Sequence, residues 1–370
     1  MDTEDRVLNI EVATTDVCNF RCKYCFEGQC GRRHMSLDEW DAIEERIRFI
    51  MRSGYFKHWW DNIRLTLWGG EPMLNLPVTE ATLKFCKEIG AKVFVYTNGT
   101  NLREFFDWMK EEVLQVQVSY DGEPINSLMR VDAGGQPTTE QTRRLILEMI
   151  DQKIKFKTKS TIPPELFKHM PDCWRDIEDI SRRAESYGHL GYGPTIDYHV
   201  SDTSRENELK TALIEIAKME LERAKQDKQY LLTWFRSTEP SFCSAGAEFF
   251  FIDIDGCVYP CHGAIYTDAK DKLRWGSVYD DTIINILEKK MMLHDRIMFD
   301  EPESCKVNPY TTYNVRCNVV AFSKSCRSTY ESRWTDYTVF DPSMKYFECV
   351  SKVRLALNRA ANKEKKDATM

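Results

Sequence analysis

Three cysteines near the start of the chain have a spacing that could support iron–sulfur chemistry. Cys18, Cys22 and Cys25 follow the pattern C-x3-C-x2-C, directly after an apolar run at residues 8–13 that is typical of a strand. Thiolates at this spacing can converge on one face of a [4Fe–4S] cluster and leave its fourth iron without a protein ligand. An open iron can bind a small molecule and transfer an electron to it. A zinc site, or three unrelated buried thiols, is the alternative interpretation of these residues.

Glycine and polar residues also follow three further strand-like runs, at the points where these runs end. They are Gly69, Gly70 and Glu71 after residues 63–68, Asn98 after residues 92–96, and Ser119 and Asp121 after residues 114–118. Glycine lets the backbone approach a ligand, and hydroxyl, amide and carboxylate groups suit a ligand with a diol, an ammonium and a carboxylate. Turn chemistry is the structural interpretation of each residue taken alone. Because chemistry on parallel sheets lies at the carboxyl ends of the strands, we expect these residues to lie around the cysteine loop.

The elements that must position these residues alternate between strand and helix. Ser36 and Glu39 form a capping box that opens the first helix, and we expect Gly54 to end it. Further helices are expected at residues 79–89, 102–112, 139–151 and 164–187, and further strands at residues 154–162 and 195–200. This alternation predicts a parallel sheet with right-handed crossovers, in an α/β fold with a partial (β/α)6 TIM-like barrel.

The C-terminal part differs in character and predicts a smaller cysteine-rich domain. A polar helix at residues 207–225 leads into it, and apolar alternation around Asp255-Gly256 predicts a hairpin. We therefore expect three parts, which are the barrel at residues 1–230, the cysteine-rich domain at residues 231–350 and a basic tail at residues 351–370.

The composition is that of an ordinary globular protein. Of the 370 residues, 42% are hydrophobic and 29% are charged, and the formal charge of -7 gives no general attraction to nucleic acid or anionic membranes. The charged N-terminus precedes no apolar signal region, and no run of about 18 apolar residues predicts a membrane span. Without an export signal, metal or cluster ligation explains the 13 cysteines better than disulfides do. We therefore expect a cytoplasmic protein.

The cysteine loop and the strand-end residues together resemble the radical S-adenosylmethionine (SAM) superfamily over about residues 8–130. In that superfamily, the open iron of a [4Fe–4S] cluster chelates the amino and carboxylate groups of SAM. The resemblance implies that Cys18, Cys22 and Cys25 hold the cluster and that Tyr24 fills the usual aromatic position. The SAM contacts that it implies are Tyr24, Gly69, Gly70, Glu71, Asn98, Ser119 and Asp121. The peptide-modifying branch of the superfamily often shows two further matches, which are Met35-Ser36 and Arg130.

The spacing of Cys243, Gly256 and Cys261 resembles the opening of the SPASM or twitch extension, which binds auxiliary iron–sulfur clusters. The dense cysteine run that usually follows is absent, because the later cysteines are spaced loosely. We therefore expect one auxiliary cluster, and its candidate ligands are Cys243, Cys261, Cys317 and Cys326.

His262 directly follows Cys261, at a place where the similar anaerobic sulfatase maturases have an aspartate that serves as the base. A histidine there could move a proton near neutral pH or ligate iron, although most single histidines do neither. The change of residue argues against sulfatase maturation as the activity.

Four lysines alternate with other residues in the fifth expected strand, and on a strand they would all point one way. They are Lys153, Lys155, Lys157 and Lys159. The later lysines would then face the barrel interior and contact an anion, either the SAM carboxylate or a phosphate on the substrate. A shorter strand that begins in solvent is the alternative.

The resemblance implies an enzyme of the oxidoreductase or isomerase class that takes one electron from a flavodoxin- or ferredoxin-type donor. It would cleave SAM and use the 5′-deoxyadenosyl radical to abstract hydrogen from a peptide or an amino-acid-derived substrate. Isomerisation of an amino-acid adduct on a modified thymidine in phage DNA is the enzymatic alternative. A zinc-binding scaffold is the alternative without catalysis.

Overall fold

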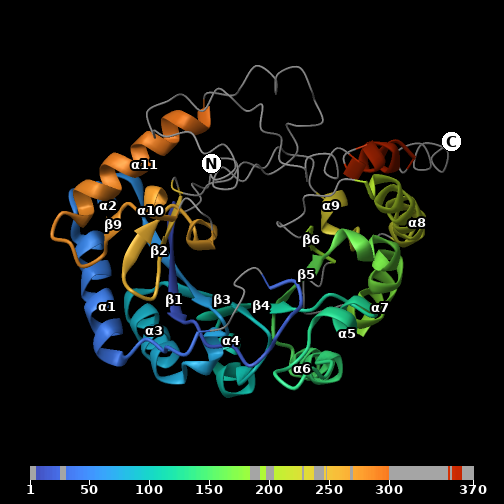
Figure 1. Cartoon of the computed structure of the whole chain (residues 1–370), viewed down its shortest axis with the longest axis horizontal. Coiled ribbons are helices and arrows are strands. Elements are labelled where there is room, and N and C mark those ends of the chain that lie inside the picture. The colour runs from blue at the N-terminus through green and yellow to red at the C-terminus, as the bar shows by residue number, and fades with distance from the viewer. Residues whose placement is uncertain are drawn as a thin grey trace.

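One curved sheet organises the computed structural model, and helices lie along its outer side (Figure 1). The structure describes residues 6–25, 31–183, 192–196, 204–226, 229–236, 246, 248–266, 270–299, 349–350 and 352–360. Within these residues, nine strands form the sheet in the order β6-β5-β4-β3-β2-β1-β7-β8-β9.

The first six strands are parallel, as their alternation with helices predicts. The strands are β1 Val7–Thr15, β2 Asn62–Gly69, β3 Lys92–Thr97, β4 Leu114–Ser119, β5 Lys157–Ile162, β6 Pro194–Ile196, β7 Phe249–Ile252, β8 Cys257–Tyr259 and β9 Gly276–Ser277. β7 pairs with β1 in parallel, whereas β8 and β9 continue the sheet in antiparallel pairs. The C-terminal region therefore extends the barrel sheet at β1.

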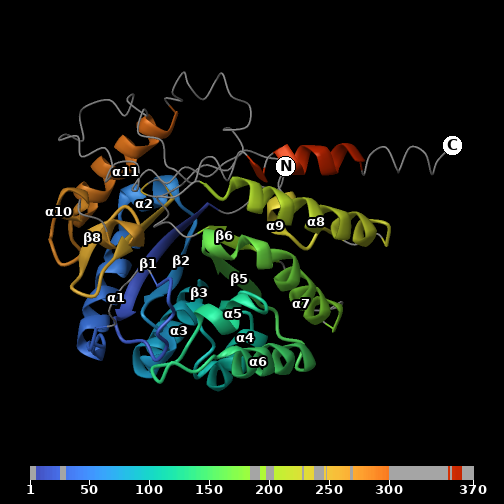
Figure 2. The ribbon, with the colours of Figure 1, turned by 45° about the vertical axis from the view of Figure 1, so that its right-hand side comes forward.

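Helices and 3-10 turns connect these strands, and the longer helices cover the outer side of the sheet (Figure 2). The helices are α1 Leu37–Arg52, α2 Gly54–Trp59, α3 Leu76–Ile89, α4 Phe106–Lys110, α5 Ile125–Met129, α6 Thr139–Asp151, α7 Met170–Arg183, α8 Glu206–Ala224, α9 Thr233–Arg236, α10 Lys270–Leu273 and α11 Ile283–Phe299. The 3-10 turns are η1 Pro72–Leu74, η2 Leu102–Phe105, η3 Pro164–His169 and η4 His262–Tyr266. This arrangement confirms the predicted partial barrel with a smaller C-terminal domain.

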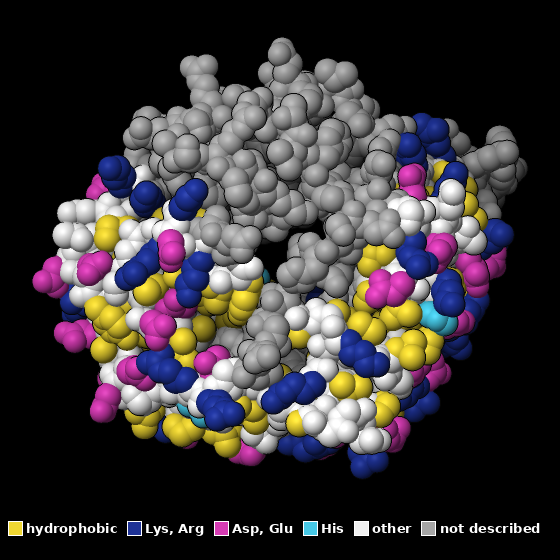
Figure 3. Space-filling model, viewed as in Figure 1, with side chains coloured by type: hydrophobic (Ala, Val, Ile, Leu, Met, Phe, Trp, Pro, Cys, Tyr) yellow, Lys and Arg dark blue, Asp and Glu magenta, His cyan; other side chains and the backbone are white. Residues whose placement is uncertain are grey.

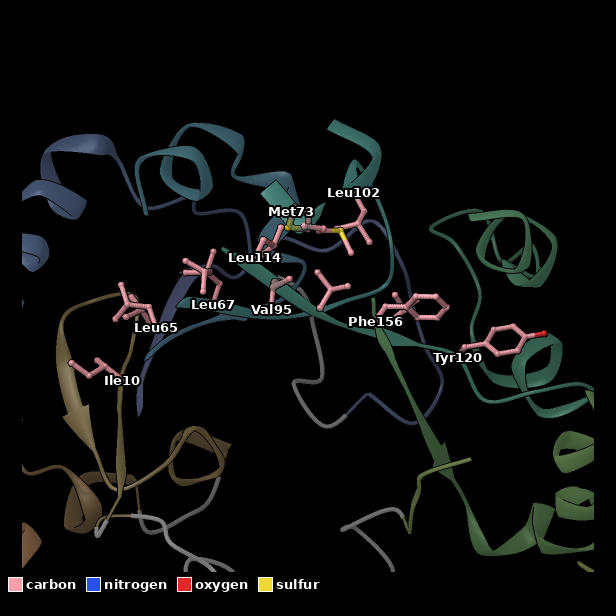
Figure 4. Close-up of a cluster of buried hydrophobic side chains, with 14 of the residues drawn as sticks. Ile10, Leu65, Leu67, Met73, Val95, Leu102, Leu114, Tyr120 and Phe156 are labelled. Carbon is pink, nitrogen blue, oxygen red and sulfur yellow. The ribbon is translucent and has the colours of Figure 1, made fainter. Parts of the chain in front are cut away.

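The main core lies between the sheet and the outer helices. Ile10, Leu65, Leu67 and Val95 are fully buried and lie side by side across three strands (Figure 4). Burying each such side chain contributes roughly 1.5–3 kcal/mol relative to an exposed position. Because neighbouring side chains on a strand point to opposite faces, the residues between these apolar positions face the interior of the barrel.

Several helix boundaries differ from the sequence predictions for local reasons. The capping box at Ser36 is present, but α1 ends at the C-cap Ser53 rather than at Gly54. Ser53 also accepts a hydrogen bond from Phe56 N and so caps α2, which the sequence analysis missed. The expected helix at 102–112 is divided into η2 and α4, and the expected helix at 164–187 begins as η3.

The prediction that four lysines share one face of a strand is wrong, because β5 begins only at Lys157. Lys153 adopts a left-handed backbone conformation with φ 60° and therefore lies in the turn before the strand. Lys155 forms an ion pair with Glu112 outside the strand. Of these four lysines, Lys157 and Lys159 lie on β5 and point to its inner face.

The helices of the described part include none that is both long and apolar enough to cross a membrane. The surface in Figure 3 shows Lys and Arg side chains interspersed with Asp and Glu over the described elements.

Candidate functional site

The cysteine loop leaves the carboxyl end of β1, as predicted. Cys18 and Cys22 are partly exposed and Cys25 is exposed. Two donors point at the first thiol, since Phe20 N lies 3.4 Å and Asn98 Nδ2 lies 3.9 Å from Cys18 Sγ. Hydrogen bonds to a sulfur ligand stabilise its negative charge and tune a bound metal. Three thiols that are at least partly exposed, with two donors at Cys18, fit an iron–sulfur cluster by the chemistry of the donor set.

Among the described residues, no group of three or more His, Cys, Asp or Glu side chains is arranged to hold a single metal ion. A [4Fe–4S] cluster binds each thiolate through a different iron, so its ligands lie farther apart than those of one ion.

The segment at residues 129–132 holds the cysteine loop by its backbone. Arg21 N donates to Val131 O at 2.7 Å, and Lys23 N donates to Met129 O at 2.9 Å. Phe20 also forms an isolated antiparallel bridge with Asp132. Because backbone pairing fixes the path of the chain, the loop between Cys18 and Cys25 is positioned by a segment more than 100 residues away.

A buried clasp of side chains strengthens this attachment. Asp121 is 0% exposed and accepts from Arg130 Nε at 2.9 Å and from Arg130 Nη2 at 3.0 Å. Its carboxylate also accepts from Thr161 N at 2.8 Å and from the Tyr24 hydroxyl. Burial alone would lower the pKa of Arg130, but the Asp121 carboxylate raises it, so the guanidinium stays charged.

A contact between Asp121 and SAM stays a prediction, and in this structure protein groups bond the Asp121 carboxylate. A carboxylate has about four lone-pair sites, and these four hydrogen bonds to protein groups fill them. Tyr24 takes part in the same clasp, and burial raises the pKa of its hydroxyl well above the ordinary value. Both residues therefore position the cysteine loop in this structure. Arg130 also lies beside Cys22, where it opposes the increase in the thiol pKa that burial causes.

The glycines of Gly69-Gly70-Glu71 are needed for contact with the cysteine loop. Gly69 has φ +130°, and a Cβ there would lie 1.9 Å from Thr15 O. A Cβ on Gly70 would lie 2.5 Å from Val17 O. Gly70 N donates to Thr15 O at 3.0 Å, so this run packs directly on the chain that leads into Cys18.

Glu71 is 1% exposed and joins the ends of two strands. Its Oε1 accepts from Met73 N at 3.1 Å and from Thr97 Oγ1 at 2.7 Å, and its Oε2 accepts from Asn98 N at 2.6 Å. A contact between Glu71 and the SAM ammonium therefore stays a prediction.

Asn98 contacts the cysteine loop through a residue that the sequence analysis missed. Its Nδ2 donates to Asn19 Oδ1 at 3.0 Å, and Asn19 Nδ2 donates to Thr100 Oγ1 at 2.9 Å. Asn19 could have been noticed in the sequence as a polar residue within the cysteine motif, but its hydrogen-bond partners are distant in sequence.

Ser119 ends β4 with its side chain on the inner face and partly exposed.

His262 lies on the inner wall of the barrel at the start of η4. Its Nδ1 lies 2.8 Å from Glu11 Oε2, and its ring stacks on Trp68 with centroids 3.8 Å apart. Glu11 is 4% exposed, and the interaction with His262 compensates for its burial. Neither Glu11 nor Trp68 was predicted, although Glu11 stands out as a carboxylate within an apolar strand.

The expected auxiliary-cluster ligands are covered only in part. Cys261 is 7% exposed and packs in a small second core with Phe251 and Tyr259. Three further expected ligands lie outside the described residues, namely Cys243, Cys317 and Cys326.

Residues 231–233, which were expected to open the cysteine-rich domain, pack on the barrel, where Leu231 O accepts from Tyr192 N at 2.9 Å.

Family models match two separate parts of the chain. A model of the radical SAM superfamily matches residues 12–173, and a model of the SPASM iron–sulfur cluster-binding domain matches residues 243–309.

The curated relatives resemble about a third of the chain. An uncharacterized protein of Methanocaldococcus jannaschii is 24% identical over 37% of this chain and 47% of its own length. A GTP 3′,8-cyclase of Alkaliphilus oremlandii is 28% identical over 35% of this chain and 40% of its own length. The chain thus spans less than half the length of these relatives.

Solved structures resemble almost the whole fold. Native anSMEcpe with bound AdoMet and the Kp18Cys peptide has a TM-score of 0.70 at 18% identity, over 96% of this chain and 99% of that chain. Streptococcus suis SuiB bound to the precursor peptide SuiA has a TM-score of 0.56 at 12% identity, over 83% of this chain and 70% of that chain.

Proposed function

The chain belongs to the radical SAM superfamily and carries a SPASM iron–sulfur domain, and from this premise we propose that it modifies a peptide or an amino-acid-derived substrate. When bound, the reduced cluster and SAM supply a 5′-deoxyadenosyl radical, which abstracts hydrogen from an unactivated carbon. The observation that carries the proposal is the C-x3-C-x2-C loop at the carboxyl end of β1, packed against Gly69-Gly70-Glu71 at the end of β2.

The residues of the loop have distinct tasks in this proposal. Cys18, Cys22 and Cys25 hold the [4Fe–4S] cluster, and the donors Phe20 N and Asn98 Nδ2 stabilise the sulfur of Cys18. The Asp121–Arg130 ion pair keeps the loop in place. A loop fixed before the cofactor binds requires little reorganisation during the reaction.

The inner wall of the barrel offers the surface against which a substrate lies. Trp68 and Tyr96 meet edge to face with centroids 4.6 Å apart, and the His262 ring stacks on Trp68. These rings bury the apolar part of a ligand and exclude water from it. Glu11 fixes the orientation of the His262 ring, and we propose His262 as the residue that holds or moves a proton at the substrate.

A peptide substrate has support from two fold neighbours, since anSMEcpe and SuiB are both described with bound peptides. The electron donor would be a flavodoxin- or ferredoxin-type protein. A modified nucleobase is the second candidate substrate, and the GTP 3′,8-cyclases among the relatives favour it.

The decisive experiment is anaerobic reconstitution with iron and sulfide, followed by reduction with dithionite in the presence of SAM. We expect a brown protein with about four to eight irons that forms 5′-deoxyadenosine. Replacing any of Cys18, Cys22 or Cys25 with alanine should abolish that product. Cys86→Ala is the matched control, because Cys86 is 0% exposed in the core and should not affect the cluster.

A colourless protein that contains zinc would reject the proposal and favour the scaffold. The substrate is tested next, by incubating the active enzyme with peptides and with DNA. Salt-dependent association with DNA would favour the nucleobase candidate.

A further inference from the structure

Backbone pairing joins the chain on the two sides of the three cysteines. Gly31 N donates to Asp16 O at 2.9 Å, and Asp16 N donates to Arg33 O at 3.1 Å. The Asp16 side chain strengthens the pairing, because its Oδ1 accepts from Arg33 N at 2.6 Å. A Cβ on Gly31 would lie 1.9 Å from Asp16 Oδ2, so this close approach requires glycine. Arg33 is therefore fixed beside Asp16, two residues before Cys18.

The Arg33 side chain extends from this pairing to the turn between β7 and β8. Its Nη1 donates to Ile254 O at 2.7 Å and to Asp255 Oδ1 at 2.8 Å, and its Nη2 pairs with Glu39 in the first turn of α1. The topology explains this contact, because β7 runs parallel to β1 and the chain leaves both strands at the same edge of the sheet. The hairpin of β7 and β8 accordingly lies beside β1 (Figure 2).

The turn after β7 is held by its own hydrogen bonds and leads to the C-terminal wall of the barrel. Asp253 Oδ1 accepts from Asp255 N at 3.0 Å and from Cys257 N at 2.8 Å. The chain continues from the turn through β8 to Cys261 and His262. One guanidinium therefore joins the cysteine loop directly to the segment that carries the proposed proton residue.

A second arginine attaches the C-terminal region to the barrel at a different place. Arg46 Nη2 donates to Tyr279 O at 3.0 Å and to Asp281 Oδ1 at 3.0 Å. Its partners are a carbonyl and a carboxylate, as are those of Arg33 in the turn. Arg46 lies within α1, however, and takes no part in the backbone pairing around the cysteines. The two arginines therefore differ in their connection to the cysteine loop rather than in the kind of contact that they make.

We propose that Arg33 is a positioning residue that couples the β7–β8 turn to the cysteine loop, so that the C-terminal domain stabilises the loop that holds the cluster. The inference rests on the proposed function, which assigns a [4Fe–4S] cluster to this loop. Each ion pair of Arg33, which is 38% exposed, is weak by itself. The planar guanidinium binds three acceptors at once, however, while the backbone of the same residue is bound to Asp16. Because coupling is reciprocal, the loop also stabilises the turn that leads to His262.

Hydrogen–deuterium exchange and iron chelation test this coupling in two forms of the protein. Exchange is measured before reconstitution, in peptides that span residues 16–25. Chelation is measured in the reconstituted and reduced enzyme, as the rate at which excess EDTA removes the cluster signal in electron paramagnetic resonance that responds to SAM. The variants are Arg33→Met, Asp255→Ala and the double variant, and Arg46→Met is the matched control. Thermal unfolding verifies that each variant is folded.

We expect Arg33→Met to accelerate both exchange and loss of the signal about tenfold, while Arg46→Met leaves both unchanged. Asp255→Ala should accelerate them about threefold, because it removes one contact of an exposed pair. The double variant should match Arg33→Met, since the effect of the turn reaches the loop through Arg33.

Equal rates in Arg33→Met and Arg46→Met would overturn the proposal, because the role of Arg33 would then be that of any attachment. So would additive effects in the double variant, or faster exchange with an unchanged rate of signal loss. Failure of the proposed function has a different signature, since the wild type would then form no cluster that responds to SAM. Hydrogen exchange would still test the coupling in that case.

Discussion

Replacing Asp121 with alanine should release the clasp that holds the cysteine loop. The substitution removes a carboxylate that accepts four hydrogen bonds and leaves the Arg130 guanidinium, which is 8% exposed, without a counter-charge. Removing one partner of a buried ion pair destabilises a protein by about 3–5 kcal/mol. Because Thr161 N also loses its acceptor, we expect a loss of about 4 kcal/mol in the free energy of unfolding. For a chain of 370 residues, this loss corresponds to a decrease in melting temperature of about 5 °C.

A double-mutant cycle separates the clasp from ordinary loss of contacts. Arg130→Met alone leaves the Asp121 carboxylate buried and unpaired, whereas the double variant removes both charges. The sum of the decreases in the free energy of unfolding in the two single variants should therefore exceed the decrease in the double variant by about 1–3 kcal/mol. Urea unfolding of the apo proteins gives the free energies, and the iron content after reconstitution shows whether the loop still holds the cluster.

Glu140→Gln is the matched control, because its ion pair with Arg144 is exposed on both sides. Such a pair contributes less than about 1 kcal/mol. The reasoning fails if Asp121→Ala is no more destabilising than this control, or if the two single losses simply add.

The glycine run and Lys159 give two further predictions. Gly70→Ala should displace Val17, lower the free energy of unfolding by about 1–3 kcal/mol and lower the iron content. Gly54→Ala is the control and should change neither quantity, because a Cβ there meets nothing within 4 Å. Equal iron content in both variants would contradict this packing argument. Lys159→Met should be more stable than the wild type at pH 7, because burial lowers the lysine pKa and so disfavours the charged form in the folded state. The wild type then regains stability as the pH rises through the folded pKa, so the difference should disappear above about pH 10.4, the pKa of an unfolded lysine. Chemical unfolding at several pH values checks this, and a difference that does not depend on pH would refute it.

The order of elements was predictable because it depends on local patterns. The capping box at Ser36, the left-handed glycine that ends α3 and the hairpin turn at Gly256 each depend on a few neighbouring residues. The C-x3-C-x2-C spacing is equally local, so the sequence placed it correctly after β1. The start of β5 was predicted too early, because Lys153 has a left-handed backbone conformation that no residue type in this stretch indicates.

The sequence by itself determined at which strand ends the cysteines, glycines and polar residues of the candidate site lie. Only the tertiary structure decided their tasks, because a side chain's role depends on partners that are distant along the chain. Asp121 was predicted as a ligand contact, but Arg130, Tyr24 and Thr161 fill its hydrogen-bonding capacity. The pairing of Glu11 with His262 joins residues 251 positions apart, which no local pattern can reveal. Such contacts form only when the sheet closes into a partial barrel and brings its inner face together.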